Sequence, residues 1–131
     1  MFRNDARAAV ILPAVTDTGE PLPGLIEAYE QTALQWGQLQ SDSAKANGVF
    51  EENHSIYKSL RNHEEGRVAI ARLMTHDSEA VRLLAATHSL AWEPEVATAT
   101  LDAIERAGGL PGVTANYTLR SYRAGQLNLD W

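Results

Sequence analysis

Six stretches of helical periodicity, separated by short polar breaks, are the feature of this sequence that most limits its fold. After residue 20, apolar side chains recur at intervals of three and four residues, which places them on one side of an α-helix. Strand-like alternation is confined to AAVILPAV at residues 8–15. The sequence therefore predicts an all-α protein. The stripe of the first stretch consists of Leu22, Leu25, Ile26, Tyr29, Ala33, Trp36 and Leu39.

Residues that start or stop helices divide these stretches. Proline is favoured in a first turn, Ser and Asp accept hydrogen bonds from free N-terminal amides, and Gly ends helices. Such signals occur at Pro21, SDSAK (41–45), THDS (75–78), Pro94 and Gly108-Gly109. Five to six helices with short connections are typical of antiparallel hairpins that stack into a HEAT- or armadillo-like α-α superhelix. The predicted helices cover residues 21–40, 45–62, 64–75, 79–91, 94–107 and 113–124.

The same spacing selects side chains for the core of the later helices. Val68 is expected to be buried in the helix over 64–75, and Val96 in the helix over 94–107. His88 follows Leu84 by four residues, so it falls on the buried stripe of its helix. A hydrogen-bonded core histidine is the expected role of His88.

Residues 67–91, RVAIARLMTHDSEAVRLLAATHSLA, resemble one HEAT repeat. The pattern places an apolar helix before a polar turn, followed by Val-Arg, a pair of small residues and a leucine. Ala85 and Ala86 allow neighbouring helices to approach closely, and Arg82 is placed to reach back across the turn and bond Asp77. One repeat cannot bury a core alone, so further helices are expected to pack around it.

A longer resemblance covers most of residues 22–127. The order LIEAYEQTALQWGQ, IYKSLRN, the HEAT-like unit and TLRSYRAGQL resembles a small bacterial family, the domain of unknown function numbered 2019. The resemblance implies a short HEAT-like superhelical domain and offers no catalytic residues to carry over. Some members look like immunity-type partners of bacterial toxins. The matching terminal residues are Thr118, Leu119, Arg120, Tyr122, Gly125 and Leu127.

Length and composition predict one domain over residues 21–131, preceded by an extension or linker at 1–20. The apolar run at 8–15 is interrupted by Pro13 and lacks a small-x-small cleavage pattern, so we do not interpret it as a signal peptide. No run approaches the roughly 20 apolar residues of a membrane span. The chain has no cysteine, which excludes disulfides and thiolate chemistry. A cytoplasmic location is expected.

The chain is acidic, with a formal net charge of −6. Residues 1–65 hold ten Asp and Glu against five Lys and Arg, whereas the second half is nearly balanced. Such a field disfavours nucleic acid, whose binding requires cations that neutralise phosphates. It favours a basic protein partner, although acidity also serves solubility alone.

His76, Asp77 and His88 are the residues from which a catalytic or metal site would be built. A His-Asp pair occurs in metal-dependent phosphohydrolases, but such a site needs further ligands at a defined spacing, and the sequence shows none. The preferred interpretation is scaffold, with no catalytic residues, no metal and no cofactor. A metal-dependent hydrolase is the least favoured alternative.

Binding of another protein to the surface of this chain is the function that remains to be considered. Trp36 and Tyr57 are expected in the core, whereas Trp92, at a helix end, and Trp131 are expected to be exposed. The predicted function is that of an intracellular immunity protein, whose acidic surface occludes the active site of a basic toxin domain. A structural or adaptor module, homo-oligomeric through an apolar interface, is the alternative. The predicted partner-binding residues are Glu27, Glu30, Glu51, Glu52, Glu64, Glu65 and Trp92.

Overall fold

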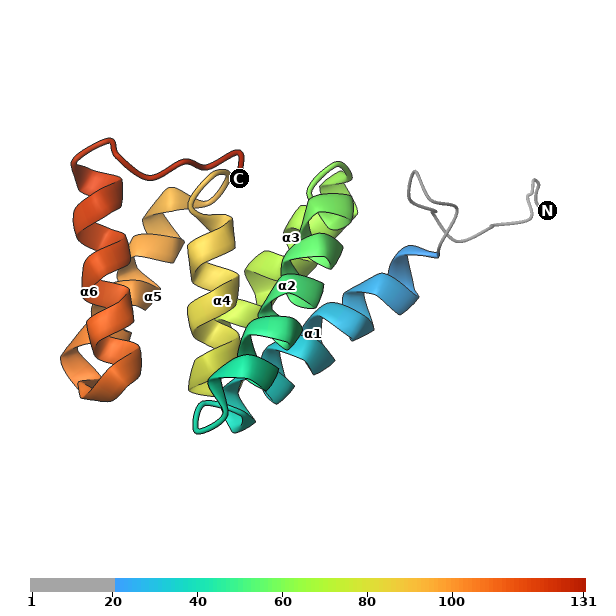
Figure 1. Ribbon diagram of the computed structural model, residues 1–131. Helices are drawn as coiled ribbons and strands as arrows, with labels where there is room; N and C mark the ends of the chain where they lie inside the picture. Colours follow the sequence, from blue (N-terminus) through green and yellow to red (C-terminus); the bar gives the residue numbers. More distant parts are fainter. Residues whose placement is uncertain (1–20) are drawn as a thin grey trace.

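A computed structural model describes residues 21–131, and every regular element in that range is a helix. The prediction of an all-α fold is confirmed (Figure 1). The predicted extension at 1–20 lies outside the described residues. The elements are α1 (Leu22–Gln38), α2 (Ser43–Leu60), α3 (Glu64–Arg72), the 3-10 turn η1 (Leu73–Thr75), α4 (Glu79–Ser89), α5 (Pro94–Ala107) and α6 (Gly109–Arg123).

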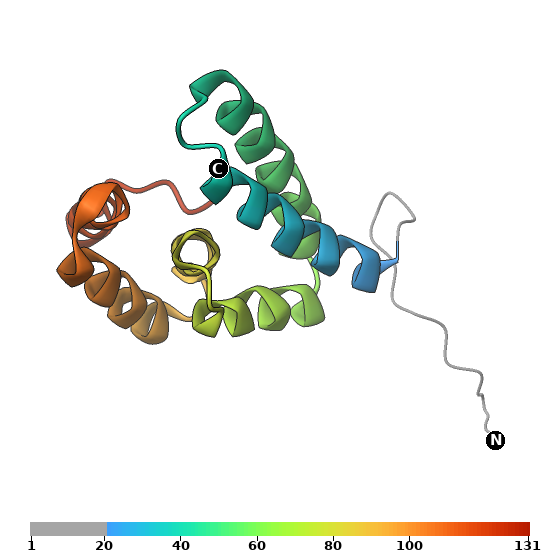
Figure 2. The same cartoon turned by 90° about the horizontal axis from the view of Figure 1, so that it is seen from below.

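Neighbouring helices pair along the chain, and α4 lies at the centre. α1 packs on α2 and α5 packs on α6, each pair joined by a short connection. Figure 2 shows α4 end-on, with α1, α3, α5 and α6 around it and α3 crossing it steeply. Seven residues of α4 are buried: Val81, Leu83, Leu84, Ala85, Ala86, His88 and Ser89. A helix that is apolar almost all round becomes the core of the domain.

The predicted capping signals form the helix ends. The Asp42 carboxylate accepts from the Lys45 amide at the start of α2, and Ser78 accepts from the Val81 amide at the start of α4. The Arg82 guanidinium does reach back across the turn before α4. It donates to the backbone carbonyls of His76 and Asp77, at 2.8 and 3.0 Å, and not to the Asp77 carboxylate.

The start of α6 was predicted wrongly. Gly108-Gly109 was predicted to end one helix, with the next starting at residue 113, but α6 begins at Gly109, four residues before the predicted start. Gly108 and Gly109 have φ angles of 84° and 72°, so the tight turn between α5 and α6 uses a conformation that other residues rarely adopt. Pro111 then lies in the first turn of α6, where amides have no intrahelical acceptor and a missing N–H costs little.

The chain after α6 turns at Gly125 and crosses to the α1–α2 pair (Figures 1 and 2). His54 Nε2 donates to the Trp131 carbonyl at 3.0 Å, and Arg61 donates to the Asp130 carbonyl at 3.2 Å. The Trp131 ring stacks on His54 with 3.8 Å between centroids. The prediction that Trp131 is exposed is therefore wrong, because its ring is half-buried against α2.

Tyr29, Tyr57 and His88 join α1, α2 and α4 in the core. His88 is buried on α4 as predicted, and its Nδ1 lies 2.6 Å from the Tyr29 hydroxyl. Tyr57 stacks on the His88 ring with 3.8 Å between centroids. Burial, assisted by His54 and Arg61 nearby, lowers the pKa of His88 to about 3, so its imidazole is neutral at neutral pH.

Candidate functional site

Five of the six predicted carboxylates are exposed. They are Glu27, Glu51, Glu52, Glu64 and Glu65, and none of them forms an ion pair with another residue in the range 21–131. Exposed carboxylates of this kind are accessible to a partner.

Glu30 is the exception, because it is half-buried and bound within the fold. Its Oε2 lies 2.9 Å from His76 Nε2. His76 Nδ1 accepts from the Ser78 amide, so Nε2 carries the proton and donates to the Glu30 carboxylate. This bond ties α1 to the turn before α4, and Glu30 is therefore a structural residue and not a freely exposed one.

The histidines considered for a metal site lie in separate environments. His76 is engaged by Glu30, whereas His88 is engaged by Tyr29 in the core. Across residues 21–131 the structure places no three His, Asp or Glu side chains where they could hold one metal ion. Within that range, no helix is long and apolar enough to cross a membrane.

Trp92 lines an open groove of about 490 Å³ between α3 and the start of α5, called here the Trp92 groove. The indole is half-buried, and its Nε1 donates to the Arg67 carbonyl at 3.2 Å. The exposure predicted for Trp92 is therefore found only in part, since the ring is half-buried. Val68 and Val96, predicted in the core, are 43% and 48% exposed and lie in this groove.

Charged side chains surround this apolar strip. Glu64 and Glu93 line the groove together with Arg67 and Arg72. The groove thus brings two of the predicted partner-binding residues together, Glu64 and Trp92. An accessible aromatic edge between exposed valines and charged residues has the anatomy of a small protein-binding surface, with an apolar centre and a polar rim.

Glu51 and Glu52 do not line the Trp92 groove. Both are exposed on α2, and the axes of α2 and α3 run in different directions (Figure 2). Of the predicted acidic residues, Glu64 therefore lines the Trp92 groove, whereas Glu51 and Glu52 do not.

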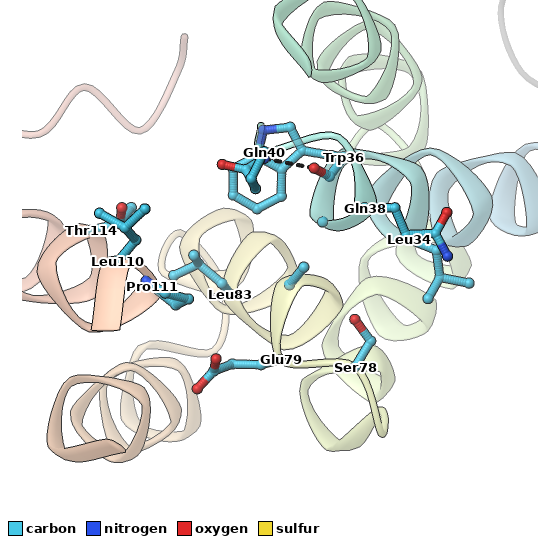
Figure 3. A pocket seen from close by; sticks show the side chains of 12 residues that line it. Leu34, Trp36, Gln38, Gln40, Ser78, Glu79, Leu83, Leu110, Pro111 and Thr114 are labelled. Carbon is cyan, nitrogen blue, oxygen red and sulfur yellow. Dashed lines mark hydrogen bonds between the residues drawn. The ribbon is translucent and has the colours of Figure 1, made fainter. Parts of the chain in front are cut away.

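A second groove, of about 470 Å³, lies where the C-terminal end of α1 meets the N-terminal ends of α4 and α6, and is called here the helix-end groove. Figure 3 shows Trp36 of α1, Leu83 of α4 and Leu110 of α6 around it. The outer side of α6 continues this apolar surface, because Leu110, Val113 and Tyr117 are 76%, 66% and 70% exposed.

Sequence reasoning missed the α6 surface because it started that helix at residue 113. The signal was present, since Leu110, Val113 and Tyr117 are separated by three and four residues. Periodicity alone does not say whether such a stripe faces the core or the solvent.

Comparisons of the chain with protein-family models, curated proteins and solved structures found no match. The resemblance to a bacterial helical-repeat family therefore stays a prediction.

Proposed function

We propose that this chain is a protein-binding module of the immunity type, which neutralises a basic partner protein by covering its active site. The Trp92 groove supports this proposal most directly, because it combines accessible apolar groups with exposed carboxylates next to it. The proposal includes the cytoplasmic location and the family resemblance predicted from the sequence. It assigns no chemistry to the chain itself.

In this mode the chain inhibits its partner by occupying the partner's active site. Exposed carboxylates such as Glu64 and Glu65 would lie where a basic cleft receives the phosphates of its substrate. Val68, Val96 and the accessible part of Trp92 would supply the apolar contact that keeps the complex together, since buried aromatic anchors dominate interface energies. Charge complementarity would act mainly on the association rate and would weaken as salt rises.

Charge reversal at the start of α3 tests the position of the interface. The double substitution Glu64→Lys and Glu65→Lys should weaken partner binding by about a hundredfold or more, because it places cations beside the centre of the contact. Glu51→Lys with Glu52→Lys should mainly slow association, since neither residue lines the groove and both act through their charge alone. Affinities and association rates are measured by surface plasmon resonance.

A matched control separates local effects from net charge. Asp77→Lys with Asp130→Lys changes the net charge by the same amount at two exposed positions outside the groove. It should leave the affinity within about threefold of wild type, as expected for exposed side chains that do not line the groove. Equal weakening by the control and by the α3 double variant would contradict an interface at the Trp92 groove.

Self-association through α6 is a second candidate function, favoured by the exposed stripe of Leu110, Val113 and Tyr117. α6 is the last helix of the described fold, and a terminal helix without a polar outer face is a common point of contact between repeat domains. Two copies of the same stripe would form a two-fold symmetric interface.

The substitution Val113→Glu tests this alternative. A dimer through α6 should dissociate at least tenfold more readily, because the substitution buries two carboxylates near the symmetry axis. Sedimentation equilibrium measures the change, with Ala103→Glu at an exposed position of α5 as the control. A monomeric wild type, or a dimer that both variants leave intact, would eliminate α6 as the interface.

A further inference from the structure

The Trp92 groove continues along α5 into a second open groove of about 330 Å³. Met74 lines both spaces, so they adjoin at this residue, and together they are called here the α5 groove. In Figure 2, α3 and α5 lie on the same side of α4, whose first two turns contribute Glu79 and Arg82 to the lining. Along its length, α5 contributes Val96, Ala99, Thr100, Ala103 and Ala107.

The walls of the α5 groove suit an α-helix as the bound element. They are helices, whose backbone groups are bonded internally, so the groove offers no sheet edge to which a strand could pair. Ala99 and Ala103 are exposed and small, which lets the axis of a bound helix come close to that of α5. From Val96 to Ala107 the wall is about 17 Å long, enough for about three turns of helix.

α6, at the edge of the fold, carries a second apolar surface (Figure 1). Among residues 21–131, the large apolar side chains that remain exposed are divided between the α5 groove and α6. Val68 and Val96 line the groove, whereas Leu110, Val113 and Tyr117 lie on α6. The spacing of three and four residues aligns the α6 side chains on one side of that helix. One contact between the two surfaces would remove all of these side chains from water.

α6 is a basic helix in an acidic chain. The chain has a formal net charge of −6, whereas residues 109–123 contain Arg120 and Arg123 and no Asp or Glu. Arg123 pairs with Asp102 of the same copy, at 3.3 Å. Arg120 is exposed, forms no ion pair with another residue in the range 21–131, and follows Tyr117 by three residues. The apolar stripe of α6 therefore ends in an exposed cation.

One end of the α5 groove is acidic. Glu64 begins α3 and Glu93 precedes α5, and both are exposed and line this end. Arg67 lines it too, but its guanidinium donates to the Arg61 carbonyl at 2.8 Å. Arg72 lies at the other end of α3. A bound helix with a C-terminal arginine therefore places its last turn beside the two carboxylates and runs antiparallel to α5.

We propose that the α5 groove binds α6 of a second copy of this chain. Arg120 of one copy then meets Glu64 and Glu93 of the other. Val113 is seven residues from Arg120 and Ala99 is six residues from Glu93, so these two side chains meet as well. Because the stripe and the groove are different surfaces, the contact is head-to-tail and repeats into a ring or an open chain of copies.

The second copy covers the Trp92 groove, which forms one end of the α5 groove. The proposed partner protein must therefore displace α6 of the neighbouring copy before it binds. This competition rests on the proposed function, whereas the assembly itself does not.

Disulfide cross-linking tests the contact, because the chain contains no cysteine of its own. Val113→Cys and Ala99→Cys are prepared as separate proteins, mixed and mildly oxidised. Positions 113 and 99 should cross-link about tenfold faster, or more, than Val113→Cys with Gln31→Cys, an exposed position of α1, since a disulfide needs close Cα atoms. Equal rates in the two mixtures, or faster pairing of Val113→Cys with itself, would overturn the proposal.

A charge swap tests the direction of the bound helix. Arg120→Glu in the Val113→Cys protein should slow the cross-link by about tenfold or more, because it sets a carboxylate against Glu64 and Glu93. Glu64→Lys with Glu93→Lys in the Ala99→Cys protein should restore the rate, which a folding defect would not do. A rate that Arg120→Glu leaves unchanged, or that the swap does not restore, contradicts the proposed direction.

Sedimentation equilibrium separates this assembly from a two-fold α6 dimer. Ala103→Glu, in the groove, and Val113→Glu should both dissociate the head-to-tail assembly. Dissociation by Val113→Glu alone, or a wild type that stays monomeric up to about 1 mM, would refute it. None of these measurements involves a partner protein, so failure here is distinct from failure of the proposed function.

Discussion

Lowering the pH from 7 to 4 is expected to remove about 3 kcal/mol from the free energy of unfolding through His88 alone. The imidazole is 2% exposed and lies among Tyr29, Tyr57, His54 and Trp131, with Arg61 nearby. Burial is the main reason that its pKa falls from 6.5 to about 3.

The direction of this effect follows from proton binding. Between pH 6.5 and pH 3 the unfolded chain binds a proton at His88 and the folded chain does not. Stability therefore decreases as the pH falls through this window, and the loss levels off below about pH 3 at roughly 5 kcal/mol. The pKa of His54 is also lowered, mainly by burial, and its protonation acts in the same direction.

Urea unfolding at a series of pH values measures this dependence. His88→Gln is the comparison, because glutamine stays neutral and keeps an acceptor for the Tyr29 hydroxyl. The variant should be less stable than wild type at pH 7 but should lose less stability on acidification. A wild type and a variant with the same slope between pH 6.5 and pH 4 would show that His88 is not the neutral buried group described here.

Gly66→Ala is expected to destabilise the fold by about 3 kcal/mol, although alanine is the better helix former. Gly66 is buried in the first turns of α3, where α3 passes the end of α2. An added Cβ would lie 2.2 Å from the Leu60 carbonyl oxygen and 2.9 Å from its carbon. Because both atoms belong to the backbone, the two helices would have to separate.

Gly48→Ala is the matched control for this substitution. Gly48 is exposed within α2, and an added Cβ there meets no atom within 4 Å. Only helix propensity changes, so this variant should gain roughly 0.5–1 kcal/mol. Thermal and urea unfolding of both variants provide the comparison. A gain in stability from Gly66→Ala would show that α2 and α3 do not approach as closely as the structure indicates.

Helix positions could be predicted from the sequence because their signals are local. Proline in the first turns of α1 and α5, and the Asp42 and Ser78 caps, define ends within a few residues. The start of α6 was the exception, since Gly108-Gly109 ends one helix and immediately begins the next. The central place of α4 is consistent with the small residues Ala85 and Ala86, which permit close packing on several sides.

Tertiary neighbours could not be predicted in the same way. Val68 and Val96 satisfy helical spacing, yet both lie beside Trp92 at the surface, because burial depends on which helix packs against a given face. The position of Trp131 depends on where the segment after Gly125 crosses the fold, and no local pattern encodes that path.

Capture of a partner from cells that naturally produce the chain tests the proposed function most directly. Wild type, the Glu64→Lys/Glu65→Lys variant and the Asp77→Lys/Asp130→Lys control are used in parallel at low and high salt. The proposal predicts one stoichiometric basic protein with wild type and the control, reduced at high salt and absent with the α3 variant. Equal capture by all three proteins, independent of salt, or capture of no basic protein at all, would contradict it.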